Sequence, residues 1–242
     1  MKIFIDELRR ARTAAGLSQE QLADAIHFSQ SMVSKVESGE RAASRDFAAR
    51  CDETLDTGGL LARLLDHQLR EETTPPWLRD WIAVEREATL LRNYHPNLIP
   101  GLLQTEDYAR CLISADPRVS ADEAEQRVAV RMERQSILPR VALVAVLDEA
   151  ALRRPIAESK VMHDQLLSPL ERPVELRVIE LGAHVGVNGP LVIATLDGSE
   201  VAYVEGQLGG RVIERRDSLL EITRVWETIQ GDALSRKSLK IS

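Results

Sequence analysis

The sequence has few of the residues that mark several common protein classes. Aromatic residues make up 4% of its 242 residues, and Cys51 and Cys111 are its only cysteines. The core must therefore rest on Leu, Val, Ile and Ala. Both cysteines lie in helical patterns beside alanine or leucine, so we expect two buried free thiols and no disulfide. Free thiols in turn favour a reducing cytoplasm.

Long apolar runs and catalytic motifs are also missing. No apolar run approaches the roughly 18–20 residues that cross a membrane, and the start, MKIFIDELRR, is too short and too charged for a secretory signal. The five histidines are scattered, without HxxxH or CxxC spacing for a metal, and there is no GxxxxGK[ST] phosphate loop. A loose glycine set, Gly206, Gly209 and Gly210 beside Arg211, carries little specificity for anion binding. We therefore predict no enzyme, no cofactor and no metal site.

The charge is acidic overall but unevenly distributed. The formal net charge is -7. Residues 1–70 hold 10 Lys and Arg against 11 Asp and Glu, a net of -1, whereas residues 71–242 hold 21 against 27, a net of -6. A protein that reads a DNA groove needs a local basic face and not a basic total. The balance thus opposes nonspecific coating of nucleic acid and leaves room for a site-specific N-terminal module.

Residues 4–70 are predicted to form five short helices. The segment contains apolar residues at helical spacing and a series of residues suited to begin or end helices. These are Gly16, Ser18 with Gln21 in a capping-box pattern, Ser29, Gly39 and Ser44. The stretch EETTPP, residues 71–76, cannot continue a helix and is predicted to be a stiff linker.

Residues 77–242 mix helical and strand patterns. WLRDWIAVEREATLLRNY and RDSLLEITRVWETIQ predict helices, whereas VALVAVLD, VELRVIEL, PLVIATLD and EVAYVEG predict strands. Between them, NLIPGLLQT has a proline and a glycine at Pro100 and Gly101, which favours a rigid structural connector, with a ligand-binding loop as the alternative. His184, between Gly182 and Gly186, is expected in a turn between strands.

The third predicted helix has the two faces that a recognition helix needs. Val33, Val36 and Met32 point to one side. Polar residues form the other face: Gln30, Ser31, Ser34 and Lys35. Glutamine can pair bidentately with adenine, and lysine can reach guanine or a phosphate. Gln19, at the start of the preceding helix, is expected over the DNA backbone, where a helix N-terminus favours phosphate.

GLSQEQLADAI followed by FSQSMVSKVESGER resembles the XRE/Cro-type helix-turn-helix family over about residues 4–70. The resemblance implies an all-α, five-helix, lambda-repressor-like domain in which Arg12 pairs with Glu37 and Gly39 ends the recognition helix. His27 departs from the family, because a glycine is usual in this turn. The backbone there often needs a left-handed conformation, which histidine tolerates at some cost. The polar face of the third predicted helix and this resemblance together give the expected DNA contacts. These are Gln19, Ser29, Gln30, Ser31, Ser34, Lys35 and Arg41.

The C-terminal part resembles that of the actinobacterial WhiJ-like, toxin–antitoxin-like regulators. The resemblance rests on a series of short motifs in this order: EREA from Glu85, PGLLQT from Pro100, LDEAALRRP from Leu147, GAH from Gly182 and YVE from Tyr203. It implies a transcriptional regulator, often with a small partner protein encoded nearby. A self-cleaving peptidase domain like that of phage repressors is disfavoured, because the linker lacks Ala-Gly or Cys-Gly and no later lysine lies in a strand pattern. A metal-binding cupin is disfavoured because paired histidines are absent.

Together, these features predict a helix-turn-helix domain at residues 1–70, a linker at 71–76 and an α+β domain with a small sheet and several helices at 77–242. The expected function is sequence-specific DNA-binding transcriptional regulation by a cytoplasmic homodimer. The C-terminal domain is expected to sense a protein partner or a small molecule. The alternative is an antitoxin-like interaction module that mainly sequesters a small partner protein.

Overall fold

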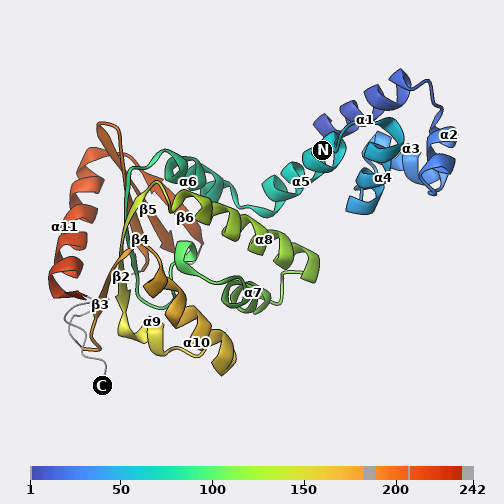
Figure 1. Cartoon of the computed structure of the whole chain (residues 1–242). Helices are drawn as coiled ribbons and strands as arrows, with labels where there is room; N and C mark the ends of the chain where they lie inside the picture. The colour runs from blue at the N-terminus through green and yellow to red at the C-terminus, as the bar shows by residue number, and fades with distance from the viewer. Residues whose placement is uncertain (1, 183–188, 207, 236–242) are drawn as a thin grey trace. The chain divides into compact units, whose positions relative to one another are not determined.

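The chain divides into two compact units, residues 1–73 and 74–242, called here the N-terminal and C-terminal units. The computed structural model describes residues 2–182, 189–206 and 208–235, and Figure 1 shows its helices and strands. The predicted linker, residues 71–76, is largely helical instead. Helix α5 continues to Thr73, and Pro76 is the first residue of α6, where a missing N–H costs no helical hydrogen bond. The prolines thus begin a helix.

The N-terminal unit consists of five helices, as predicted. They are α1 (Lys2–Ala14), α2 (Gln19–Ala25), α3 (Gln30–Ser38), α4 (Arg45–Leu55) and α5 (Leu60–Thr73). One apolar core joins them, and its largest fully buried side chains include Leu8, Leu22, Ile26 and Phe47. Cys51 is buried in this core as expected.

The helix starts follow the predicted capping residues. Ser18 and Gln21 form a complete capping box, with Ser18 Oγ accepting from Gln21 N at 3.1 Å and Gln21 Oε1 accepting from Ser18 N at 2.8 Å. Ser29 and Ser44 cap α3 and α4 by accepting from the backbone N–H three residues on. These contacts satisfy N–H groups that a helix leaves unpaired at its start.

The C-terminal unit is built on one mixed sheet of seven strands in the order β6-β5-β4-β1-β2-β3-β7. The strands are β1 (Leu90–His95), β2 (Ala142–Asp148), β3 (Glu175–Ile179), β4 (Leu191–Leu196), β5 (Ser199–Gly206), β6 (Gly209–Ile213) and β7 (Leu234–Ser235). The pairs β1–β2 and β2–β3 are parallel, and the remaining pairs are antiparallel. The predicted α+β class is confirmed, and the sheet is larger than expected.

Helices cover both faces of this sheet (Figure 1). One face carries α6 (Pro76–Glu87), α7 (Glu106–Ser114), α8 (Ala121–Arg134), α9 (Glu149–Arg153) and α10 (Ser159–Leu167), and α11 (Arg216–Asp232) covers the other. Short 3-10 segments lie at Gly101–Leu103, Gln135–Ile137 and Ser168–Glu171. Alternate residues of β1 face the two sides: Leu91 joins the core under α6, and Tyr94 joins the core under α11 with Trp226.

Two local predictions in this unit are wrong. The helix expected over residues 77–94 ends at Glu87, and Leu90–His95 is a central strand, because pairing on both sides with β2 and β4 outweighs the helical pattern. Cys111 is exposed. It lies on α7, whose inner face is formed by Tyr108 and Ala109.

The glycines of the β5–β6 hairpin serve packing. The Tyr203 ring stacks on Trp81 with centroids 5.2 Å apart, and a Cβ on Gly210 would lie only 1.9 Å from the Tyr203 hydroxyl oxygen. A Cβ on Gly209 would lie 2.9 Å from Trp77. The hairpin therefore needs glycine, which has no side chain, at the two positions where aromatic rings approach its backbone. His184 lies outside the described residues. Among the described helices, none is both long and apolar enough to span a membrane.

Candidate DNA-binding interface

Helices α2 and α3 are joined by a turn whose backbone is left-handed at one residue. His27 has φ of 59°, as expected for a position where glycine is usual, and its side chain is exposed. Phe28 N then donates to Ala23 O at 2.9 Å, which holds the turn against α2. Ser29 begins α3, and Gly39, with φ of 80°, ends it in the left-handed conformation. Caps at both ends and the fixed turn define the length and direction of α3.

The two faces of α3 separate as predicted. Val33 and Val36 are buried against the other helices. Gln30, Ser31 and Lys35 are exposed on the opposite face. Ser34, in the same row, is half-buried. The exposed row is therefore a narrow strip of short and long polar side chains on a rigid support.

A buried carboxylate at the end of α3 links three helices. Arg12 of α1 donates to Glu37 through Nε at 2.6 Å and through Nη2 at 3.0 Å, which is the predicted pair in bidentate form. Gln19 of α2 donates to Glu37 Oε2 at 2.8 Å. Only 2% of the Glu37 side chain is exposed. The network fixes α3 relative to α1 and α2.

The electrostatics of this network favour its ionised state. Burial alone would raise the pKa of Glu37, but hydrogen bonds from Arg12 and Gln19 and the charges of Arg12 and Arg9 outweigh burial and lower it. The hydrogen bond to Glu37 likewise raises the pKa of Arg12. Glu37 is thus a structural anion that stays charged near neutral pH.

The structure gives Gln19 a part in this bracing. Its amide nitrogen donates one of its two N–H groups to Glu37 Oε2 of α3. It is also the first residue of α2, where the first backbone N–H groups point out of the helix. The phosphate contact expected at this position stays a prediction.

Arg9 also belongs to this network, although it is not among the residues predicted from the sequence. Its guanidinium donates from Nη2 to the Glu37 carbonyl oxygen, and its Nε lies 3.9 Å from Glu37 Oε2. Arg9 precedes Arg12 by three residues, and residues three apart share a helix face. This spacing is the signal that would have found it.

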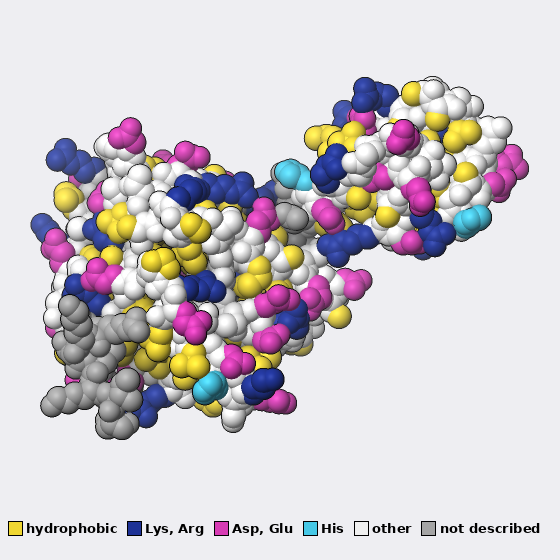
Figure 2. All heavy atoms as spheres, in the orientation of Figure 1, with side chains coloured by type: hydrophobic (Ala, Val, Ile, Leu, Met, Phe, Trp, Pro, Cys, Tyr) yellow, Lys and Arg dark blue, Asp and Glu magenta, His cyan; other side chains and the backbone are white. Residues whose placement is uncertain are grey.

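Two cations near the exposed strip have no acidic partner among the described residues. Lys35 and Arg41 are both exposed, whereas Arg10, Arg45 and Arg50 of the same unit form ion pairs. Arg41 follows α3 closely, because its backbone N donates to Lys35 O at 3.1 Å. Basic and acidic side chains are interspersed on the visible face of the N-terminal unit (Figure 2). The end of α3 thus carries two exposed cations that could meet a phosphate or a base.

Comparison with protein families accounts for nearly the whole chain. Residues 4–65 match a family described as a helix-turn-helix domain, which supports a DNA-binding regulator. Residues 78–238 match a family described as a domain of unknown function, DUF5753. The chain belongs to the DUF5753 family. No curated protein matches this DUF5753 protein in sequence. The family description names no ligand, activity or partner for the C-terminal unit.

Proposed function

We propose that this DUF5753 protein is a sequence-specific transcriptional regulator that places α3 in the major groove of DNA. The supporting observation is the combination of an exposed polar strip with an inner face that is buried and braced through Glu37. A helix fits the major groove, where the four base pairs present different donors and acceptors. A helix fixed at both ends can hold its side chains in one register along those base edges.

The residues divide into base-reading and backbone-binding groups. Gln30 and Lys35 project farthest from the strip and are assigned to base edges, with Ser31 and Ser34 allowing close approach. Ser29 caps α3, and its backbone and the first N–H groups of α3 are assigned to the DNA backbone. Arg41 is assigned to a phosphate, together with the start of α2 at Gln19.

Replacing Gln30 or Lys35 with alanine should weaken specific DNA binding by about 1–3 kcal/mol for a base contact. A duplex selected from a random-sequence library serves as the probe, and affinity is measured across a salt series. If Lys35 instead binds a phosphate, Lys35→Ala should weaken binding to all DNA sequences equally. It should also reduce the slope of log K against log salt concentration by about 0.9.

The control for this measurement is Lys160→Ala, which removes an exposed lysine from α10 of the C-terminal unit. It should leave affinity and salt slope unchanged. Unaltered binding by both Gln30→Ala and Lys35→Ala would contradict the assignment of α3 as the recognition helix. Failure of the library to yield any preferred sequence would contradict sequence specificity.

We propose further that the protein acts as a dimer and that the C-terminal unit receives a signal. One helix-turn-helix unit covers little DNA, whereas two linked units on half-sites about 34 Å apart gain affinity through effective concentration. Light scattering of the free protein and of its complex with the selected duplex should give two chains per duplex on a roughly palindromic site. A complex with one chain per duplex would contradict the dimer.

A further inference from the structure

The C-terminal unit contains a cavity of about 260 Å³ between the sheet and the α6–α8 side. Residues from six separate segments line it: α6, β1 with the loop that follows it, α7, α8, β4 and β5. Its apolar lining residues include Leu78, Ile99 and Val192 with Trp81. Its polar lining residues include His95, Gln104 and Arg131.

Arg131 brings a cation into this cavity. Its Nη1 donates to Gln104 Oε1 at 2.8 Å, which uses one of five N–H donors, and no ion pair within 4.0 Å is recorded for it in the described parts of the chain. Burial first, and then the positive charge of Arg134, lower the pKa of Arg131 to about 10, although Glu205 and Glu85 partly oppose this. An acceptor with negative charge would remove this electrostatic penalty.

His95 supplies a second donor. Its Nδ1 accepts from the backbone N–H groups of Asn97 at 3.3 Å and Leu98 at 3.1 Å, so the proton of the neutral ring must be on Nε2. Burial, with Arg131 nearby, lowers the pKa of His95 to about 4, which keeps the ring neutral near pH 7. The ring therefore offers an N–H at Nε2 and no acceptor.

The other charged residues of the cavity lining are Glu85, Arg134 and Glu205. Glu85 accepts from Arg134 at 2.7 and 2.9 Å and from Trp81 Nε1 at 2.8 Å, so the Glu85 and Arg134 charges are mutually satisfied. Glu205 is exposed and also lines the cavity. Its negative charge disfavours a dianion, such as a phosphate monoester, more strongly than a monoanion.

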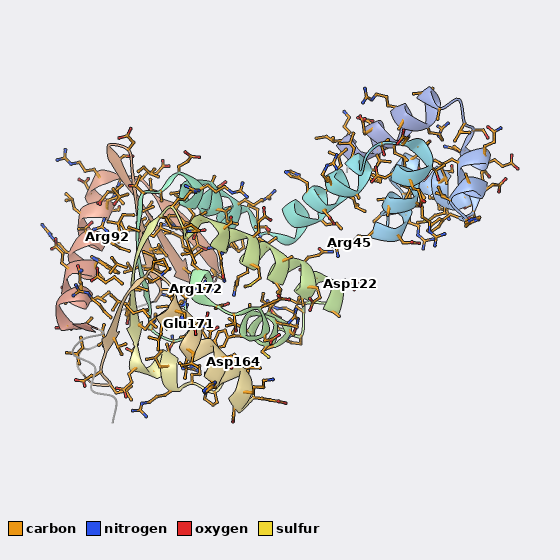
Figure 3. The ribbon with its side chains drawn as sticks, viewed as in Figure 1. Arg45, Arg92, Asp122, Asp164, Glu171 and Arg172 are labelled. Atoms are coloured by element: carbon orange, nitrogen blue, oxygen red, sulfur yellow. The ribbon has the colours of Figure 1, made fainter. Side chains whose placement is uncertain are left out.

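The walls of the cavity are held in place before any ligand enters. Long side chains bind the backbone of the loop around Gly101–Leu103: Gln135 donates to Gln104 O at 2.7 Å, Gln165 to Leu103 O at 2.9 Å and Arg172 to Leu102 O at 3.0 Å. Figure 3 labels Arg172 among the helices on this side of the sheet. The rigid connector expected from Pro100 and Gly101 is thus also a wall of the cavity, which reduces the ordering cost of binding.

We propose that this cavity binds a small monocarboxylate with an apolar body. The carboxylate accepts hydrogen bonds from Arg131 and from Nε2 of His95, and the apolar body lies against Leu78, Trp81 and Val192. The role of this ligand as the signal of a regulator rests on the function proposed above. Binding of the ligand itself does not depend on DNA.

The test is saturation-transfer NMR on the full chain, without DNA, with benzoate, phenylacetate and hexanoate and their uncharged amides as matched probes. At least one carboxylate should bind about tenfold or more tightly than its amide, because a charge-assisted pair with Arg131 is lost in the amide. Arg131→Gln should abolish this preference. Arg127→Gln should retain it, because Arg127 lies on the same helix, pairs with Glu123 and does not line the cavity.

A second variant covers the case in which Arg131→Gln does not fold. In His95→Asn, the side-chain oxygen can replace Nδ1 as the acceptor for the loop backbone, while the Nε2 donor is removed, so the carboxylate preference should fall with the fold intact. Absence of binding by all three carboxylates, equal binding of the amides, or an undiminished preference in both Arg131→Gln and His95→Asn would overturn the proposal. Each of these results is independent of whether the protein binds DNA.

Discussion

Glu37→Gln is expected to lower the free energy of unfolding of the N-terminal unit by about 3 kcal/mol or more, because a buried ion pair that loses one partner leaves the other charge uncompensated. Glutamine preserves the shape of Glu37 but cannot balance the charge of Arg12. Only 16% of the Arg12 side chain is exposed, so water compensates that charge poorly. The hydrogen bond from Gln19 also loses its charged acceptor. For a unit of this size, such a loss lowers Tm by more than about 10 °C.

The distribution of tryptophan separates the two units in this experiment. Trp77, Trp81 and Trp226 all lie in the C-terminal unit. Far-ultraviolet circular dichroism reports helices in both units, whereas tryptophan fluorescence reports the C-terminal unit alone. Glu37→Gln should therefore shift part of the circular dichroism transition and leave the fluorescence transition in place.

The control is Asp46→Asn, which breaks an exposed pair with Arg50 in the same unit and should change Tm little. The pH dependence gives a further check. The pKa of Glu37 in the folded state lies below its ordinary value of 4.5, so its stabilising contribution is present above pH 4.5 and is lost as pH falls through the folded pKa. Glu37→Gln should flatten this acid dependence. A wild-type Tm and an unchanged acid profile would show that the network does not stabilise α3.

The second large effect is expected for Glu85→Gln in the C-terminal unit. Glu85 is 3% exposed and binds Arg134 through both carboxylate oxygens. Burial lowers the pKa of Arg134, and the charge and hydrogen bonds of Glu85 more than offset this. Without that partner, a buried guanidinium remains uncompensated, at an expected cost of about 3–5 kcal/mol.

This loss should appear as a lower midpoint of the tryptophan fluorescence transition, since Trp81 Nε1 itself donates to Glu85. Glu133→Gln is the matched control: Glu133 adjoins Arg134 on α8 and lies 3.9 Å from Arg86 in an exposed pair. Its midpoint should stay close to that of the wild type. Equal midpoints for Glu85→Gln and Glu133→Gln would show that the Glu85–Arg134 pair does not hold α6 to α8.

The helix-turn-helix geometry was largely predictable, because the contacts that define it are local. Ser18 and Gln21, which form the capping box, are three residues apart. The left-handed backbone at His27 and Gly39 affects only the turn in which each residue lies. Even the longer Arg12–Glu37 contact was implied by a family resemblance. The bracing role of Gln19 was not predictable, because its contact with Glu37 depends on how α2 packs against α3.

The C-terminal unit was predictable in class but not in detail. The segments VALVAVLD, VELRVIEL, PLVIATLD and EVAYVEG match β2, β3, β4 and β5, whereas β1 lies at the end of a segment whose pattern predicts a helix. Its polar residues Arg92 and Asn93 conceal the alternation of a strand. In the structure, Arg92 pairs with Glu200 of β5 on the same sheet, 108 residues away. Because this partner is so distant in the sequence, the residues around β1 show no periodic pattern that would predict a strand.

The helical caps, the left-handed turn and the division of charge between the two units follow directly from the sequence, since these features depend on residues close together in the chain. The tertiary structure alone decided the strand order, the burial of Glu85 against Arg134 and the cavity that contains Arg131 and His95. These features join segments tens of residues apart. Burial changes the cost of a charge there, and burial is a property of the packed chain and not of any short stretch of it.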